Sequence, residues 1–179
     1  ALSWGAYLNA TEDNSDGTVT VTTSGVEDGQ TVTIVLGGVT DTGSVSSNSA
    51  TVTIAASDLD ALADGAHTMT VDVSDAAGNA ATQVTSSSFT ADATAPTVSS
   101  ISMNDTALKS GDTATLTIVF SEAVTAFANA DLTIPNGTLT NVATGDNITW
   151  TATYTPTADV TDTTNVISVA TSYTDLAGN

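Results

Sequence analysis

A five-residue motif, Asp-x-Ala-Gly-Asn, occurs twice in this chain, at residues 75–79 and again at residues 175–179. Recurrence at a fixed spacing is typical of tandem modules, and the spacing here has the length of one small domain. Shortly after the first copy, residues 92–96 read Asp-Ala-Thr-Ala-Pro, which is typical of a short linker. We therefore predict two domains, residues 1–91 and residues 97–179, joined by the linker 92–96.

Apolar residues alternate with Thr along short segments of both predicted domains. Clear examples are Thr18–Thr22, Thr31–Leu36, Thr51–Ile54 and Thr149–Tyr154. Alternation with a period of two places the apolar side chains on one face, as in half-buried antiparallel strands. Roughly one residue in five is Thr, which tolerates the solvent face of a strand. The pattern therefore predicts an all-β chain.

The predicted strands share this alternation and are separated by turns rich in Gly, Asn and Asp. In the first domain they cover residues 1–5, 17–24, 30–36, 43–47, 50–55, 66–74 and 81–91. In the second domain they cover residues 97–103, 113–120, 131–135, 138–143, 147–155 and 165–173. Short strands at this spacing predict two tandem immunoglobulin-like antiparallel β-sandwiches. A single helical turn is expected within residues 57–63.

The second sandwich is expected to lack its last strand in this sequence. In the first domain the Asp-x-Ala-Gly-Asn motif stands between the sixth and the seventh predicted strand, whereas the second copy ends at Asn179. A strand donated by another chain would complete such a domain, as in donor-strand complementation. We keep this as one possible partner.

The charge balance excludes several classes of function. Twenty acidic residues stand against a single basic one, Lys109, for a formal net charge of −19. Nucleic acid is a poor partner because binding phosphate requires a basic surface. No apolar run approaches the roughly 20 residues that a membrane span requires, so we expect no membrane insertion.

There is no Cys, and His67 is the only His. Because nucleophilic and acid–base catalysis have almost no candidate residues, we expect the protein not to be an enzyme. A structural role is expected for His67, at the corner where the sixth predicted strand of the first domain begins.

Several segments together resemble a known family of repeats. These are residues 25–32, 120–124, 136–139 and 150–156, with both copies of the five-residue motif and the Ala-Asp-Ala-Thr-Ala-Pro joint. They resemble the bacterial immunoglobulin-like tandem repeats in the extender region of giant RTX-type and biofilm-associated adhesins. The resemblance covers essentially the whole chain. It implies secretion by a type I route to the bacterial cell surface, a role in cell adhesion, and Ca²⁺ at the joints between modules.

The strand order also indicates where a cation would bind. In a seven-strand sandwich, the turn after the second strand and the turn after the sixth lie at the end that faces the preceding module. In the second domain that end holds Glu122, Asp175 and Asn179, and the linker contributes Asp92. Calcium takes about 6–8 oxygen ligands in flexible geometry. We therefore predict a Ca²⁺ site at Asp92, Glu122, Asp175 and Asn179. The alternative is that Asp75 and Asp175 only cap tight turns, while Asp92 solvates the linker.

Further candidate ligands lie in the first domain, which has no preceding linker Asp in this sequence. They are Glu27, Asp28, Asp75 and Asn79 at the corresponding end, and Glu12 and Asp13 in the first turn. Residues 13–17 are similar to the start of an EF-hand loop but lack the distal Glu at the required spacing. We interpret residues 13–17 as a turn.

Composition and resemblance together favour a structural extender or spacer that neighbouring repeat modules of the same polypeptide continue. Two alternatives stay open. The first is a module that binds a saccharide or ice, for which Trp4 and Tyr7 near the N-terminus are the candidate exposed aromatic residues. The second is a filament subunit that a donated strand completes.

Overall fold

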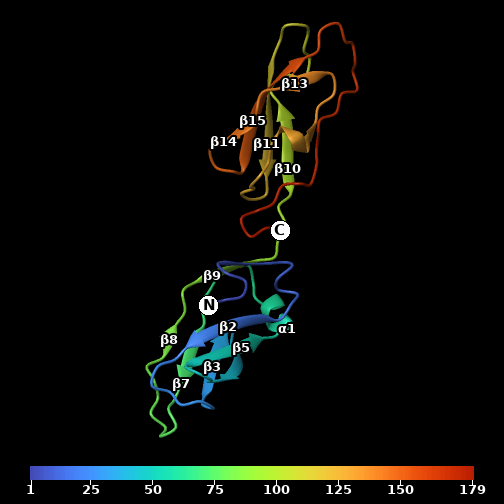
Figure 1. The fold of residues 1–179 in the computed structure, drawn as a ribbon. Helices are drawn as coiled ribbons and strands as arrows, with labels where there is room; N and C mark the ends of the chain where they lie inside the picture. The colour runs from blue at the N-terminus through green and yellow to red at the C-terminus, as the bar shows by residue number, and fades with distance from the viewer. The chain divides into compact units, whose positions relative to one another are not determined.

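The computed structural model describes residues 1–179, and the chain is nearly all β. It divides into two compact units (Figure 1). The first unit comprises Ala1–Thr94 together with Asn179, and the second comprises Ala95–Gly178. The predicted all-β, immunoglobulin-like fold is confirmed, and the division into two units is compatible with the predicted pair of tandem sandwiches. None of the helices has the length and apolar character needed to cross a membrane.

The first unit contains nine short strands and one helical turn. In chain order they are β1 (Tyr7–Asn9), β2 (Gly17–Thr22), β3 (Thr31–Leu36), β4 (Val39–Ser44), β5 (Ser49–Ile54), α1 (Ala56–Asp60), β6 (Gly65–His67), β7 (Thr70–Val73), β8 (Val84–Thr85) and β9 (Phe89–Asp92).

The strands of the first unit form two facing layers with a separate edge sheet. One layer has the order β4-β3-β7-β8, and the other is the antiparallel pair β2-β5, which is drawn over it in Figure 1. The edge sheet has the order β1-β9-β6, in which β1 and β9 run parallel and β6 and β9 antiparallel. The last predicted strand, 81–91, is thus divided between two sheets.

The core of the first unit follows directly from the alternation. Val32, Ile34 and Leu36 of β3 are buried, as are Val52 and Ile54 of β5. Burying an aliphatic side chain of this size contributes about 1.5–3 kcal/mol. The alternate Thr positions face outward and carry the solvent surface of the sheets.

The structure differs from the sequence-based expectation at Trp4 and in the fourth strand. Trp4 is only 7% exposed and packs edge-to-face on Phe89 with ring centroids 5.4 Å apart, so its predicted exposure is wrong. The strand expected at 43–47 begins instead at Val39. The reason is that Gly37 and Gly38 both adopt positive φ, which closes a two-residue hairpin directly after β3.

His67 has the structural role expected of it. Its Nε2 donates a hydrogen bond of 2.7 Å to the carbonyl of Ala63, four residues earlier. Its ring lies 5.9 Å from the ring of Phe89, measured between centroids. The side chain therefore fixes the corner at which the chain enters the edge sheet.

The second unit has seven strands and one 3-10 turn. In chain order they are β10 (Val98–Met103), β11 (Ala114–Phe120), η1 (Asn129–Asp131), β12 (Leu132–Thr133), β13 (Gly137–Leu139), β14 (Ala143–Thr144), β15 (Thr149–Pro156) and β16 (Ser168–Val169).

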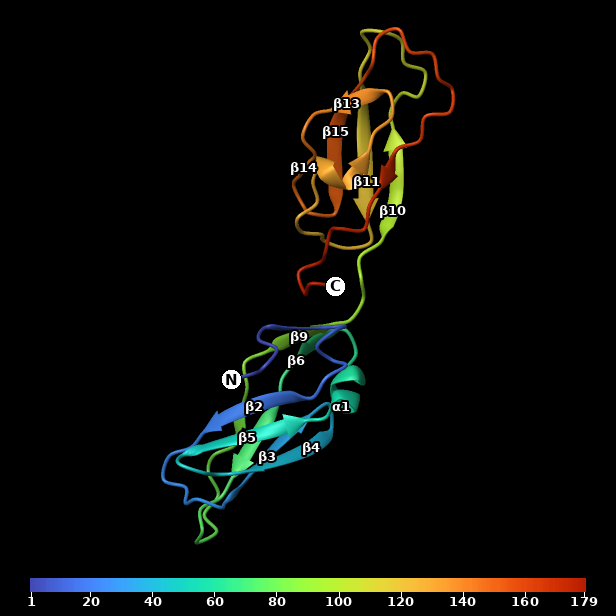
Figure 2. The same ribbon diagram turned by 45° about the vertical axis from the view of Figure 1, so that its right-hand side comes forward.

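One sheet of the second unit has the order β10-β11-β15-β13, with β14 also paired to β15 (Figure 2). The other sheet consists of β12 and β16 alone. The core between them centres on aromatic rings, because Phe120 packs edge-to-face on Phe127 at 5.0 Å and on Tyr173 at 4.7 Å. Trp150 packs on Phe127 at 5.3 Å and is one of the partly buried residues that border this core.

Candidate metal centre

Two acidic residues of the second unit, Glu122 and Asp175, come together at one end of its sandwich. Glu122 stands two residues after the end of β11, and Asp175 opens the second copy of the five-residue motif. The segments that carry them are joined by a bridge. The Thr125 N–H donates to the Thr174 carbonyl at 2.6 Å, and the Thr125 hydroxyl donates to the Asp175 carbonyl at 3.3 Å. Backbone pairing therefore fixes where the two carboxyl groups stand.

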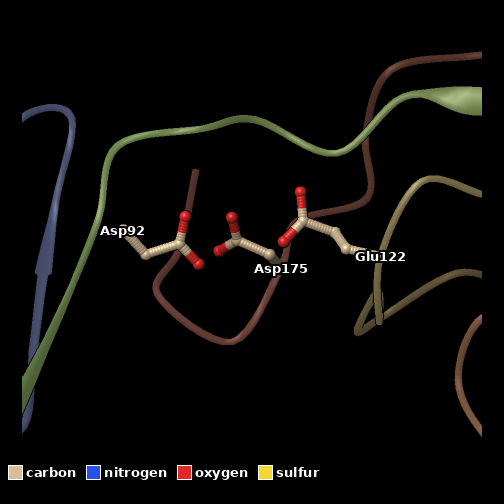
Figure 3. Close-up of side chains that lie close together, drawn as sticks. All are labelled: Asp92, Glu122 and Asp175. Carbon is tan, nitrogen blue, oxygen red and sulfur yellow. The ribbon is translucent and has the colours of Figure 1, made fainter. Parts of the chain in front are cut away.

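The carboxyl groups of Glu122 and Asp175 each offer an oxygen, and these oxygens lie within 4.8 Å of each other. Figure 3 shows the two carboxyl groups side by side. Asp175 is 3% exposed, and its Oδ1 accepts a hydrogen bond of 2.6 Å from the Gly178 N–H. Two carboxylates at this separation repel, and the repulsion is strongest where water is excluded. Hard oxygen donors of this kind fit Ca²⁺.

Asp92 belongs to the first unit, where it ends β9 and lies opposite Asn9 of β1. Its Oδ1 accepts a hydrogen bond of 3.3 Å from the Thr94 N–H. Asn179 also groups with the first unit. The Asn179 Nδ2 donates to the Asp92 carbonyl at 2.7 Å, and its Oδ1 accepts from the Ala10 N–H at 2.8 Å.

Asp64 of the first unit holds the start of the linker through its side chain. Asp64 Oδ1 accepts from the Ala93 N–H at 3.0 Å, and its Oδ2 accepts from the Thr94 hydroxyl at 2.6 Å. These two bonds, the one from Thr94 first, lower the pKa of the Asp64 carboxyl below its ordinary value. The start of the linker is therefore held on the first unit by a charged side chain, at a position that Asp-rich composition alone could not distinguish.

The other end of the linker is held on the second unit. The Thr97 N–H donates to the Ser121 hydroxyl at 2.9 Å, and the Ser121 N–H donates to the Thr97 carbonyl at 2.8 Å. Ser121 immediately precedes Glu122 in the chain. The point at which the linker joins the second unit is thus next to one of the two paired acids.

The candidate ligands at the far end of the first unit are brought together only in part. Both oxygens of Asp75 accept from Asn79, from its N–H and its Nδ2, at 2.7 Å each. The Ala76 N–H donates to Glu27 Oε2 at 2.9 Å, which places Glu27 at the same turn. These bonds to Asn79 lower the pKa of the Asp75 carboxyl. Asp75 therefore caps its own tight turn, as the alternative to a metal site predicts for this residue.

Asp28 does not join that turn, because its Oδ1 accepts from the Ser47 N–H at 2.8 Å.

Glu12 and Asp13 lie in the turn between β1 and β2. Glu12 Oε2 accepts from the Asn9 N–H at 3.2 Å, and Asp13 Oδ1 accepts from the Asn14 amide at 3.1 Å. Asp13 is only 6% exposed. Burial raises the pKa of its carboxyl, and the charge of Asp60 raises it further. The two side chains therefore act within their own turn, which agrees with our interpretation of residues 13–17.

Comparison with known proteins assigns the family. A comparison with curated proteins gave no match. A family model described as a bacterial Ig-like domain matches residues 92–179. A solved bacterial immunoglobulin-like domain from the ice-binding adhesin of M. primoryensis is 36% identical, with 48% of this chain and 84% of that chain covered and a TM-score of 0.37. This chain belongs to the family of bacterial immunoglobulin-like domains.

Two further solved structures resemble this pair of bacterial immunoglobulin-like domains. One concerns the host cell surface retention of a 1.5-MDa bacterial ice-binding adhesin, at 25% identity over 83% of this chain and 49% of that one, with a TM-score of 0.47. The other is a Ca²⁺-stabilised adhesin with which an Antarctic bacterium reaches out and binds ice, at 24% identity over 96% and 46%, with a TM-score of 0.40. The chain thus spans about half the length of these two structures.

Proposed function

We propose that this chain is a pair of extender modules from a secreted bacterial surface adhesin, stiffened by Ca²⁺ at the joint between them. The adhesin immunoglobulin-like family is structural rather than enzymatic. The observation that carries the proposal is the pair of carboxyl groups of Glu122 and Asp175, whose oxygens lie within 4.8 Å of each other. They stand at the end of the second sandwich where the linker enters, next to the anchor between Thr97 and Ser121.

The length of the joint supports a mechanical role. The side chain of Asp64 holds the linker at Thr94, and Ser121 holds it at Thr97. Only Ala95 and Pro96 stand between these anchors. Consecutive Cα atoms are 3.8 Å apart, so the two anchoring residues are at most about 11 Å apart in any arrangement. The Pro ring removes further freedom, because it fixes its own φ and restricts the residue before it. A joint this short needs few additional bonds to become stiff.

We assign Asp92, Glu122, Asp175 and Asn179 as ligands of the proposed Ca²⁺. Asp92 is two residues before the anchor at Thr94 and so stays near the joint. Three carboxylates supply charge, while the Asn179 carbonyl groups, other backbone oxygens and water complete a shell of about 6–8 oxygens. Bound Ca²⁺ would offset the repulsion among the carboxylates and restrict the angle between the modules. Extracellular Ca²⁺ modules bind with dissociation constants of about 10⁻⁴–10⁻³ M, which suits the outside of a cell.

Two alternative functions receive different weight from the structure. A saccharide-binding tip needs an exposed aromatic platform. Trp4 is buried in the core, so Tyr7, at 40% exposure, has no exposed Trp4 ring beside it to form such a platform. Nothing in the Thr-rich strands distinguishes an ice-binding face from ordinary outward strand positions.

Isothermal titration calorimetry of the metal-free chain with Ca²⁺ tests the proposal. We expect a saturable heat that the double substitution of Glu122→Gln with Asp175→Asn abolishes. Substituting Asp28→Asn serves as the matched control, because Asp28 lies outside the proposed site and should leave the heat unchanged. Absence of any heat with the unsubstituted chain would refute calcium binding.

A further inference from the structure

The segment that leads to Asp175 is held in place by individual contacts rather than by a sheet. β16 ends at Val169, and residues 170–175 belong to no strand. The ring of Tyr173 packs edge-to-face on Phe120, with ring centroids 4.7 Å apart, and so anchors the middle of the segment on the core. The position of Asp175 therefore depends on which side chains hold the segment on either side of this ring.

Asp131 is a buried acid that lies outside the candidate metal centre. It is 8% exposed and ends the 3-10 turn η1. Its Oδ2 accepts from the Ala128 N–H at 2.8 Å, and its Oδ1 accepts from the Ser172 hydroxyl. Its backbone carbonyl accepts from the Ala170 N–H at 2.7 Å. Asp131 therefore ties the start of the segment to η1 through both its side chain and its backbone.

Thr125 holds the other end of the segment. Its hydroxyl lies 3.2 Å from both the carbonyl and the hydroxyl oxygen of Thr174, and 3.3 Å from the carbonyl oxygen of Asp175. Its N–H donates to the Thr174 carbonyl at 2.6 Å. Glu122 stands three residues before Thr125 in the chain. One short loop therefore carries one acid of the pair and binds the residue that carries the other.

The loop that contains Thr125 has a strained backbone. Ala126 has a φ of 59°, in the left-handed region, whereas the other non-Gly residues with positive φ are all Ser, Asn or Asp. Val124 and Phe127, on either side, are buried in the core. Such strain persists where the surrounding structure imposes it, and it is common at functional sites. The core therefore fixes the conformation of this loop without help from a cation.

The turn that carries the first copy of the motif is held differently. There the Ala76 N–H donates to Glu27 Oε2 at 2.9 Å, and the carboxyl of Asp75 accepts two bonds from Asn79. A carboxylate thus makes the contact to the motif in the first unit, whereas a neutral hydroxyl makes it in the second. A hydroxyl joins the two segments of the second unit without adding a further negative charge beside the acid pair.

We infer that Asp131 and Thr125 are positioning residues for the cation, an inference that rests on the proposed function. We call their contacts, Asp131 with Ser172 and Thr125 with Thr174 and Asp175, the clamp. The repulsion between the carboxylates of Glu122 and Asp175 falls with distance, so a loosely held segment would move them apart. The clamp opposes this movement and keeps the two carboxyl groups close enough to share one ion. Contacts to the ligands of a metal orient them in the same way.

Removing the two hydroxyls of the clamp tests the inference. The clamp variant combines Ser172→Ala with Thr125→Val, which keeps the β-branched shape and the N–H of Thr125. The probe is Tb³⁺, a hard cation that takes oxygen ligands as Ca²⁺ does. We expect the variant to bind Tb³⁺ about tenfold or more weakly in a luminescence titration, because loss of such outer contacts costs about 10–100-fold in affinity. Luminescence lifetimes in H₂O and D₂O should show more water on the bound ion.

Three further variants separate positioning from charge and from general loss of stability. The pair Ser172→Thr with Thr125→Ser keeps both hydroxyls and should restore the affinity. In Asp131→Asn, the side-chain amide accepts from the Ala128 N–H and donates to the Ser172 oxygen, so binding should be unchanged. Gly137→Ala destabilises the same unit outside the clamp and should also leave the affinity unchanged. An affinity that falls equally in Asp131→Asn or in Gly137→Ala would overturn the inference.

A measurement without metal distinguishes failure of this inference from failure of the proposed function. In chelator, a double-mutant cycle of Glu122→Gln and Asp175→Asn measures the repulsion of the acid pair through the melting temperature. The clamp variant should show a smaller repulsion. A chain that binds no Tb³⁺ but shows this decrease would keep the clamp and overturn the proposed Ca²⁺ site. Tb³⁺ binding that the clamp variant leaves unchanged would overturn the positioning role and keep the proposed function.

Discussion

Replacing Asp175 by Asn separates a metal ligand from a turn cap, because the two roles predict opposite changes in stability without metal. The substitution keeps the shape of the side chain and the acceptor for the Gly178 N–H, which bonds to Asp175 Oδ1 at 2.6 Å. It removes one of the two negative charges of the Glu122 and Asp175 pair, whose carboxyl oxygens lie within 4.8 Å of each other. If the pair exists mainly to bind a cation, the metal-free variant should be more stable than the unsubstituted chain.

The structure sets the size of this effect. Two unit charges at 4.8 Å interact with about 1 kcal/mol in bulk water and about 3 kcal/mol at an effective dielectric constant near 20. A domain of 60–100 residues changes its melting temperature by about 4–8 °C per kcal/mol. Asp175→Asn should therefore raise the melting temperature of the metal-free second unit by about 5–20 °C. With Ca²⁺ at about 100 times the dissociation constant, the unsubstituted chain gains about 2.7 kcal/mol, and the variant gains less.

Differential scanning calorimetry in chelator and in excess Ca²⁺ measures both quantities. We expect the stability order of the two proteins to reverse between the two conditions. Asp146→Asn is the matched control, because Asp146 Oδ1 accepts from the Ile148 and Thr149 N–H groups in a turn of the same unit. Its change should have the same sign with and without Ca²⁺. A melting temperature of Asp175→Asn that falls equally in both conditions would refute the reasoning and leave Asp175 as a turn cap.

Three further predictions concern packing, the linker and pH. Gly137→Ala places a Cβ against the Tyr154 ring, too close for both to fit without a shift, and should destabilise the second unit by about 1–3 kcal/mol in denaturant unfolding. Gly145→Ala, with open space around it, should be neutral. Asp64→Ala removes two hydrogen bonds to the linker and should increase linker motion, measured by ¹⁵N relaxation, without unfolding either unit. Unchanged relaxation of the linker would contradict the anchoring role of Asp64. The pKa of Asp13 is raised in the folded state above its ordinary value of 3.8, so at intermediate pH the native state binds more protons there than the unfolded state. The stability of the first unit should therefore fall as pH rises from 3.8 through the folded pKa. Asp13→Asn should remove this part of the pH dependence in unfolding titrations, and an identical pH profile in the variant would contradict it.

The fold was largely predictable because its main signal is local. Alternation with a period of two decides which face of a strand is buried, and in β3 the residues Val32, Ile34 and Leu36 are all buried as the pattern requires. The start of β4 was missed because it depends on the positive φ of Gly37 and Gly38. The exposure of Trp4 was mispredicted because the ring packs on Phe89, which is 85 positions later in the chain.

The candidate site was harder to predict because Asp is abundant. Strand order brings Glu122 and Asp175 to one end of the second sandwich, and the structure places them there. The sequence cannot distinguish Asp64, whose side chain holds the linker, from Asp28, whose Oδ1 accepts from the Ser47 N–H. The difference lies in backbone N–H groups that come from distant segments, and no spacing rule reports these.

The central claim is that Ca²⁺ makes the joint between the two modules stiff. Small-angle X-ray scattering of the 179-residue chain, with Ca²⁺ and with chelator, tests it directly. We expect a single narrow distribution of particle dimensions with Ca²⁺ and a broad one without it. The double substitution of Asp92→Ala with Glu122→Ala should give the broad distribution in both conditions while both modules stay folded. Scattering that is identical with and without Ca²⁺ would contradict the account.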